Sequence, residues 1–151
     1  MSADYPSMTT AEIRSKFLNF FEERGLKLYP SSSLVPDDPS LLLANAGMNQ
    51  FKEYYQGKKT MKEIGAISCQ KCVRTNDIDC IGEDGRHLSF FEMLGDFSFG
   101  GVSKEQACAW AFELITKEFK LPLDRLYFTV FTEDDETHDV WRSLGVAEDH
   151  I

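Results

Sequence analysis

The spacing of apolar residues predicts a helix near the start of the chain. Thr9 and Glu12 form a capping-box pattern, in which a hydroxyl and a carboxylate accept hydrogen bonds from free backbone N–H groups. Four apolar residues follow at the spacing of one helix face: Ile13, Phe17, Phe20 and Phe21. Because glycine commonly ends helices, Gly25 marks the stop. We therefore predict an amphipathic helix over residues 10–24.

Three later segments also predict helices. Ser103 and Gln106 repeat the capping pattern, and an apolar face follows, made of Ala107, Trp110, Ala111, Leu114 and Ile115. This helix extends to about residue 119. Residues 48–55 and 134–144 have the composition of shorter helices, and Val140 and Trp141 are expected to face inward in the second of them.

Strands are expected where apolar residues alternate with polar ones or form short apolar runs. Five segments fit one of these patterns: residues 26–29, 41–44, 64–74, 86–99 and 126–132. We predict that 64–74 and 86–99 pair as antiparallel strands, joined by a loop rich in Asp and Gly. Because helices flank the strand pairs without a regular βαβ alternation, the pattern favours an α+β fold with an antiparallel sheet.

Length and charge limit the organisation and the partners. The 151 residues fit a single domain, with residues 1–8 as a loose leader. A net charge of −9 argues against strong binding of nucleic acid by this chain alone, because the phosphate backbone is also negative. It does not exclude a local basic pocket for one nucleotide. No segment approaches the roughly 20 apolar residues of a membrane span. Without a signal-peptide pattern, we expect a cytoplasmic location and no membrane partner.

The cysteines raise the question of a metal site. Cys69 and Cys72 have the CxxC spacing, whereas Cys80 and Cys108 stand alone. A structural zinc site needs four ligands, usually from two such pairs. Residues three apart on a strand also point to opposite faces. We therefore expect free thiols and no zinc, while a zinc-binding module using the CxxC remains an alternative.

Five stretches carry a resemblance to a known family. They are AEIRSKF at 11–17, SSSLVP at 31–36, NAGMNQFK at 45–52, CQKCVR at 69–74 and RHLSFFEMLGDFSFG at 86–100. In this order they are similar to the first and second motif regions of the alanyl-tRNA synthetase family, a class II synthetase. The resemblance covers nearly the whole chain and implies a class II fold, with an ATP site on one face of an antiparallel sheet.

The resemblance also implies an activity and its participants. The family activates alanine with ATP to alanyl-adenylate and passes the alanyl group to tRNA. Magnesium accompanies ATP because the phosphate charge must be offset. For this chain the implied partners are ATP and alanine, with tRNA contacted only through regions that we expect to be absent here.

Arg74 is the candidate that the resemblance places at the reacting phosphate. It occupies the position of the second-motif arginine, which holds the α-phosphate and the amino acid carboxylate. A guanidinium is a forked donor and can meet charge that develops there. From the residues alone, a strand-end arginine paired with Asp77 or Asp79 is the favoured interpretation. The surrounding motif favours the functional role.

The other candidates follow the loop that is rich in Asp and Gly. The resemblance places Arg86 or His87 against the outer phosphates or near the adenine; as an alternative they are surface residues. Phe90 and Phe91 face opposite sides of a strand, and Phe91 is chosen to stack on adenine. Met93 shares its face and either lines the base pocket or belongs to the core. The predicted ATP-binding residues are Arg74, Arg86, His87, Phe91 and Met93, with Arg74 also the catalytic candidate.

Two further segments have a structural and a functional interpretation. Residues 45–50 could line the edge of the site, but a turn into a helix is favoured. The acidic run at 133–136 could supply magnesium ligands, but a solvated helix start is favoured, because acids stabilise helix N-termini.

The sequence also departs from the family. The second-motif loop is short and lacks a lysine, Asp96 replaces a usual Asn, and residues 101–103 replace an acidic-aromatic segment. No third motif precedes Ile151, so we expect a partial, truncated catalytic domain with little or no aminoacylation by itself. Open sheet edges predict self-association. The alternative is a non-catalytic nucleotide-binding or regulatory paralogue.

Overall fold

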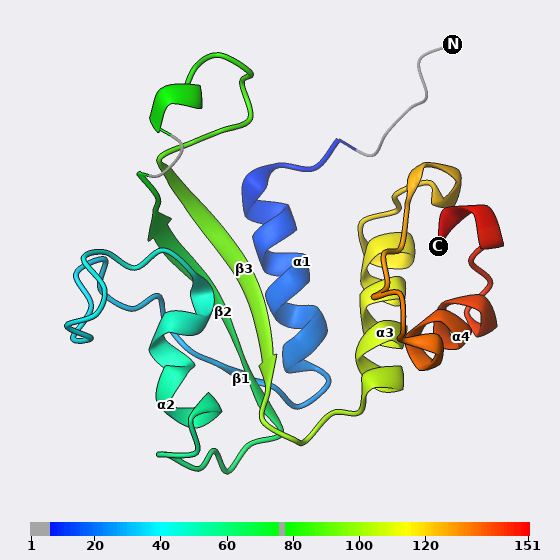
Figure 1. Cartoon of the computed structure of the whole chain (residues 1–151), viewed down its shortest axis with the longest axis horizontal. Coiled ribbons are helices and arrows are strands. Elements are labelled where there is room, and N and C mark those ends of the chain that lie inside the picture. Colours follow the sequence, from blue (N-terminus) through cyan, green and yellow to red (C-terminus); the bar gives the residue numbers. More distant parts are fainter. Residues whose placement is uncertain (1–6, 76–77) are drawn as a thin grey trace. The chain divides into compact units, whose positions relative to one another are not determined.

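A three-stranded sheet organises one of the two compact units into which the chain divides (Figure 1). In this computed structural model, the described residues are 7–75 and 78–151. One unit is Phe17–Gly101; the other combines Met1–Lys16 with Val102–Ile151. The first six residues of the expected leader lie outside the described part. The single partial catalytic domain stays a prediction.

The sheet contains the predicted antiparallel pair. β2 (Gly65–Val73) pairs with β3 (Phe90–Ser98) from Gly65 opposite Ser98 to Val73 opposite Phe90. β1 (Lys27–Leu28) adds a short parallel strand on the other side of β2. The α+β class is confirmed, with this parallel strand in addition.

The predicted strand at residues 86–99 begins four residues late. The backbone N–H groups of Arg86 and His87 donate to the side chain of Asp84, at 2.9 and 3.0 Å. They are therefore not used in a strand ladder, and regular pairing starts at Phe90. A local turn takes these residues out of the strand.

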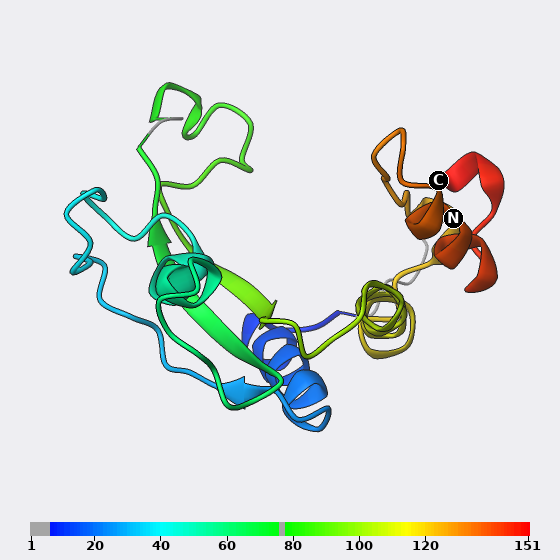
Figure 2. The same ribbon diagram turned by 60° about the horizontal axis from the view of Figure 1, so that its bottom comes forward.

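The two sheet faces have different covers. Directly opposite residues of an antiparallel pair share a face, so Gln70 and Met93 lie on the same side. This side is covered by a 3₁₀ helix (Gly47–Phe51) and α2 (Lys52–Tyr55). The 3₁₀ helix packs closely on the sheet, because a Cβ added to Gly47 would lie only 3.1 Å from the Phe97 ring. Figure 2 shows α1 (Thr10–Glu22), from Phe17 onward, on the opposite side.

Aromatic rings form the core of this unit on both faces. Phe51 is 1% exposed, and four rings surround it: Phe97 at 4.8 Å, Tyr29 at 5.3 Å, Phe99 at 6.0 Å and Tyr54 at 6.4 Å between centroids. On α1, the Phe21 ring meets Phe17 and Phe20 edge-on, at 5.0 and 5.1 Å. Such aromatic pairs contribute to stability beyond the area they bury.

The strand expected at residues 41–44 is wrong. Leu42 is 89% exposed, and the segment consists of turns and bends. The N–H of Ala44 donates to Leu34 in the preceding loop, while its carbonyl accepts from Val73. These backbone bonds fix a loop at the end of β2 rather than another strand.

The second unit contains the helices predicted after residue 102. α3 (Lys104–Glu113) is capped by Ser103, whose hydroxyl accepts from the Gln106 N–H at 3.1 Å, and continues as a π-helical turn (Leu114–Glu118). α4 (Asp135–Ser143) is capped by Asp134. The acidic run at 133–136 thus begins a helix, as the favoured interpretation predicted.

The strand predicted at residues 126–132 is also wrong, although its alternation is real. Phe128 is 6% exposed and lies 4.8 Å from the Trp141 ring, whereas Tyr127 is 73% exposed. The Phe128 N–H donates to the His150 carbonyl, and His150 Nδ1 bonds to the Leu126 carbonyl. Within the described residues of this unit, no strand runs beside the segment, so it joins no sheet.

No helix in the described part of the chain is long and apolar enough to cross a membrane.

Candidate functional site

Arg74 lies directly after β2 and is anchored by its backbone and its side chain. Its N–H donates to the Ser89 carbonyl at 2.9 Å, which extends the hairpin contact. Its Nε donates to the Asn45 carbonyl at 3.0 Å, and its Cζ lies 5.2 Å from the centre of the Phe91 ring. Within the described residues, no hydrogen bond or ion pair joins it to Asp79; Asp77 lies outside them. The guanidinium is therefore positioned by the sheet face.

Phe91 and Met93 lie beside Arg74 on that face. Phe91 opposes Cys72, Met93 opposes Gln70, and both side chains are half-buried. The Met93 sulfur accepts from the Gly47 N–H at 3.2 Å. Phe90, 51% exposed, points to the other face. Three of the five predicted site residues thus share one face, and residues 45–47 form its border.

Gln70 supports this face and was not singled out by the sequence. Its side chain is 1% exposed, and its Oε1 accepts from the Ser32 N–H at 2.8 Å, the Ser32 hydroxyl at 3.1 Å and Gln50 Nε2 at 3.0 Å. Its Nε2 donates to the carbonyls of Ser32 and Lys71. The sequence signal was a polar residue at an inward position of a strand, since such a residue needs buried partners.

Arg86 and His87 lie in the exposed loop between β2 and β3 (Figure 1). One carboxylate organises both residues: Asp84 Oδ1 accepts their two backbone N–H groups, and Oδ2 lies 2.6 Å from His87 Nδ1. The N–H groups of His87 and Arg86, in that order, lower the pKa of Asp84 to about 2. Asp84 was also missed; its signal is an Asp two residues before Arg86 in a Gly-rich turn.

The two groups of site residues are not joined directly. Within the described residues, no hydrogen bond or ion pair links Arg86 or His87 to Arg74, Phe91 or Met93. The structure therefore brings three predicted residues together on the sheet face and holds the other two in the loop that follows Arg74.

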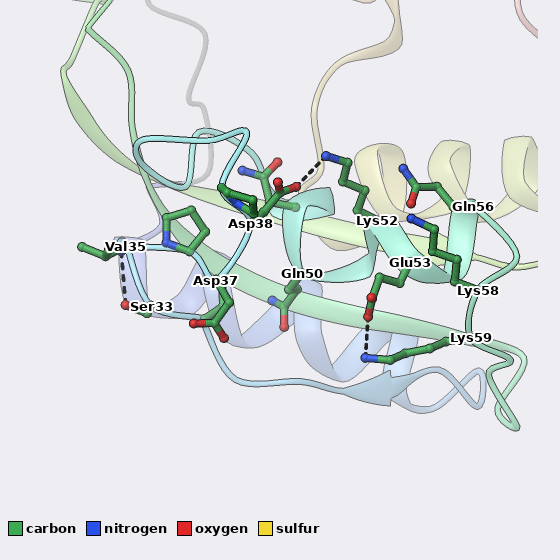
Figure 3. Close-up of a pocket in the computed structure, with 14 residues that line it drawn as sticks. Ser33, Val35, Asp37, Asp38, Gln50, Lys52, Glu53, Gln56, Lys58 and Lys59 are labelled. Atoms are coloured by element: carbon green, nitrogen blue, oxygen red, sulfur yellow. Dashed lines mark hydrogen bonds and ion pairs between the residues drawn. The ribbon is translucent and has the colours of Figure 1, made fainter.

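A separate cavity of about 560 Å³ lies between the loop at residues 32–39 and the segment 49–59 (Figure 3). Three lysines and three carboxylates line it: Lys52, Lys58, Lys59, Asp37, Asp38 and Glu53. Four of these charges are paired, Lys52 with Asp38 and Lys59 with Glu53, each at 2.5 Å. Lys52 holds the pKa of Asp38 well below its usual range. None of the five predicted site residues lines this cavity.

The described residues offer no metal centre. No group of three or more His, Cys, Asp or Glu side chains in residues 7–75 and 78–151 could hold a metal ion. Cys72 is buried and Cys69 half-buried, and both are free thiols. Burial raises the pKa of the Cys72 thiol.

The chain is similar to known proteins over nearly its whole length. Residues 12–151 match the family described as tRNA synthetases class II (A). An alanine--tRNA ligase from Synechocystis is 51% identical over the whole chain, and a chloroplastic/mitochondrial alanine--tRNA ligase from Sorghum bicolor is 52% identical over 92% of it. One from Fervidobacterium nodosum is 49% identical over 95% of the chain.

The chain matches only part of these relatives. It spans 17% of the Synechocystis protein and 15% of the Sorghum protein. The matching residues nevertheless include the whole hairpin and its loop, which carry all five predicted site residues. The chain belongs to the class II (A) family of tRNA synthetases.

Proposed function

We propose that this chain forms part of the amino acid activation site of an alanine–tRNA ligase. The relatives named above are alanine--tRNA ligases, and this chain matches a part of each at about half identity. The observation that carries the proposal is the anchoring of Arg74 over Phe91 on one sheet face. There a cation and a flat apolar surface are adjacent, as a nucleotide requires.

Arg74 is proposed to hold the α-phosphate. Its Nε already donates to the Asn45 carbonyl. Among the described residues, no hydrogen bond or ion pair uses its two terminal nitrogens, which therefore remain for a ligand. A guanidinium held in this way can donate two parallel hydrogen bonds to phosphate oxygens. Because the donor is fixed before the reaction, it stabilises charge developing on those oxygens without reorganisation.

Phe91 and Met93 are proposed to border the adenine, while Arg86 and His87 meet the outer phosphates. Stacking of a base on an aromatic ring contributes about 1–3 kcal/mol. Arg86 and His87 are exposed and lie in the loop after Arg74, where extended phosphates would be accessible. The site thus divides into a sheet-face half and a loop half.

In the proposed reaction, a carboxylate oxygen of alanine attacks the α-phosphorus of ATP. A new oxygen–phosphorus bond forms, and the bond to the β-phosphate breaks, releasing pyrophosphate. The alanyl group then passes from the adenylate to a tRNA hydroxyl, which leaves AMP. The family implies magnesium with ATP, yet the described residues contain no cluster that could hold it, so no residue is assigned to the metal.

The location of the protein stays a prediction. A cytoplasmic enzyme is expected from the sequence, while the relatives include chloroplastic/mitochondrial and bacterial ligases.

Calorimetric titration tests the binding part of the proposal. Wild-type chain and Arg74→Ala are titrated with magnesium–ATP and with a non-hydrolysable alanyl-adenylate analogue. We expect Arg74→Ala to weaken both ligands by at least about tenfold, since a charge-assisted bond contributes roughly 1.5–3 kcal/mol. Lys71→Ala, which removes an exposed cation from the same strand, is the control. Equal affinities of wild type and Arg74→Ala would contradict the role.

A chimera tests the catalytic part. This chain replaces the matching residues of the Synechocystis ligase, and alanine-dependent exchange between ATP and pyrophosphate is measured. Exchange that disappears with Arg74→Ala supports the proposal. No exchange by a folded chimera that still binds ATP would favour the alternative, a non-catalytic nucleotide-binding paralogue.

That alternative has one supporting observation. At position 101, where the family usually carries an acidic residue, a Cβ would lie 2.5 Å from the Ile64 carbonyl oxygen. The backbone packs so closely there that only glycine fits, so restoring the family's residue would require local movement.

A further inference from the structure

One carboxylate in the β2–β3 loop makes three contacts with the two residues that follow it. Asp84 Oδ1 accepts from the N–H groups of Arg86 and His87, and Asp84 Oδ2 lies 2.6 Å from His87 Nδ1. Gly85 has φ 68°, a left-handed conformation that a residue with a Cβ rarely adopts. The turn therefore depends on both the carboxylate and the glycine.

These contacts decide which nitrogen of His87 is free. The Asp84 side chain is ionised near neutral pH, because its pKa is about 2, and an ionised carboxylate only accepts hydrogen bonds. Nδ1 must therefore carry a hydrogen and donate it to Asp84. No hydrogen bond or ion pair within the described residues uses Nε2, so this nitrogen remains for a ligand.

The same turn orients a second cation. The Arg86 backbone is held by Asp84, while its exposed guanidinium has no hydrogen-bond or ion-pair partner within the described residues. Two neighbouring residues thus offer an unpaired guanidinium and a free imidazole nitrogen from one ordered turn. The guanidinium donates to phosphate oxygens, which accept hydrogen bonds and carry negative charge, and Nε2 can donate to them as well when the imidazole carries both hydrogens.

We propose that Asp84 is a positioning residue: it holds His87 with Nδ1 occupied, so that Nε2 meets the outer phosphates of the nucleotide. This inference rests on the proposed function, since it assumes that ATP is the ligand. Asp84 acts through His87 and does not touch the ligand itself. When His87 is protonated, Nε2 donates to a phosphate oxygen while Asp84 offsets the charge from the other side of the ring.

Asp84→Asn separates the turn from the ring contact. Asparagine keeps an oxygen that can accept the N–H groups of Arg86 and His87, but its second polar atom is a donor and cannot accept from Nδ1. The proton of neutral His87 should then move to Nε2, and the ring should lose its fixed orientation. The control is Asp79→Asn, which removes the same charge from the same exposed loop.

Nitrogen-15 NMR of the His87 ring in the 151-residue chain measures which ring nitrogen carries the hydrogen, and it needs no ligand. We expect protonated Nδ1 in wild type and Asp79→Asn, and a shift toward protonated Nε2 in Asp84→Asn. Identical ring spectra of wild type and Asp84→Asn would overturn the positioning role. This outcome would leave the proposed function intact.

Comparing the affinities for magnesium–ATP and for adenosine tests whether the loop contacts the phosphates. We expect Asp84→Asn to bind ATP about three- to tenfold more weakly, because the doubly protonated imidazole loses the carboxylate that orients it and offsets its charge. The loss of a negative charge alone would instead strengthen binding. Adenosine, which has no phosphates, should bind wild type and variant alike. An equal loss for adenosine, or equal ATP affinities of Asp84→Asn and Asp79→Asn, would overturn the inference.

Two substitutions at His87 test which ring nitrogen is used. The amide nitrogen of Gln can reach the position of Nε2, whereas that of Asn corresponds to Nδ1. His87→Gln should keep most of the ATP affinity, and His87→Asn should lose as much as Asp84→Asn. The opposite order would overturn the assignment to Nε2. A wild-type chain that binds no ATP would overturn the phosphate contact and the proposed function together, whatever the ring spectra show.

Discussion

The sheet-face half and the loop half of the proposed site are held in place by different means. Arg74 and Met93 bond to Asn45 and Gly47, partners 29 and 46 residues away in the sequence. Arg86 and His87 are held by Asp84, two and three residues away. The first half therefore depends on the folded sheet and its cover, whereas the second depends mainly on one turn.

The largest expected effect is on the free energy of unfolding and comes from substituting Gln70. It tests whether the loop half keeps its structure when the sheet-face half is weakened. Gln70→Leu removes the shared acceptor of the half-buried donors of Ser32 and Gln50. We expect the free energy of unfolding to fall by about 1–3 kcal/mol, measured by urea denaturation. The Asp84 turn should persist in the folded variant, with unchanged nitrogen-15 signals of the His87 ring.

Lys71→Leu is the matched control, because Lys71 is the next residue of β2 and its side chain is exposed. Its unfolding free energy should stay within about 0.5 kcal/mol of wild type. If Gln70→Leu also disturbed the His87 ring, the loop would depend on the sheet and the two halves would not be separate.

An effect of similar size, on nucleotide binding rather than on folding, is expected at the adenine surface. Phe91→Ala should weaken nucleotide binding by about 1–3 kcal/mol, because a stacking ring is lost. Phe90→Ala removes a neighbouring ring on the opposite face and should leave the affinity unchanged. Calorimetry with magnesium–ATP compares the two. A larger loss for Phe90→Ala would place the adenine on the other side of the sheet.

The smallest effect concerns the pH at which the loop turn is lost. The pKa of Asp84 is about 2 in the folded chain, below the roughly 3.9 of an unfolded chain. Its hydrogen bonds therefore stabilise the fold fully above about pH 4, and this contribution is lost as pH falls toward 2. Carbon-13 NMR of the Asp84 carboxyl should show a midpoint near 2.

His87→Ala sharpens this measurement. The backbone N–H groups of His87 and Arg86 lower the pKa of Asp84 more than the imidazole does. The midpoint should thus remain well below 3.9 in the variant. A midpoint near 3.9 would show that the ring, not the backbone, holds the turn.

Two predicted strands show how far sequence patterns predicted the fold. Residues 64–74 and 126–132 both read as strands, but only the first contains one, β2. Only the first has neighbours, β1 and β3, with which to form ladders. At 126–132 the backbone bonds go to His150 instead. Alternation fixes which side chains face inward, but pairing depends on what lies alongside.

The predicted site shows the same division. The motif around residues 69–100 indicated Arg74, Phe91 and Met93, and the period of two placed Phe91 and Met93 on one face. It did not indicate Gln70, whose partners lie 20 and 38 residues away, in loops without a periodic pattern. Asp84 could have been recognised, because its contacts span only three residues.

By itself, the sequence determined the helix starts, the hairpin and the family, because caps, period-two alternation and motif order depend on near neighbours along the chain. Only the tertiary structure decided that Asn45 receives Arg74, that Gly47 reaches Met93, and that residues 41–44 and 126–132 stay outside the sheet. The physical reason is that backbone polar groups need partners, and for distant segments the packed fold supplies them.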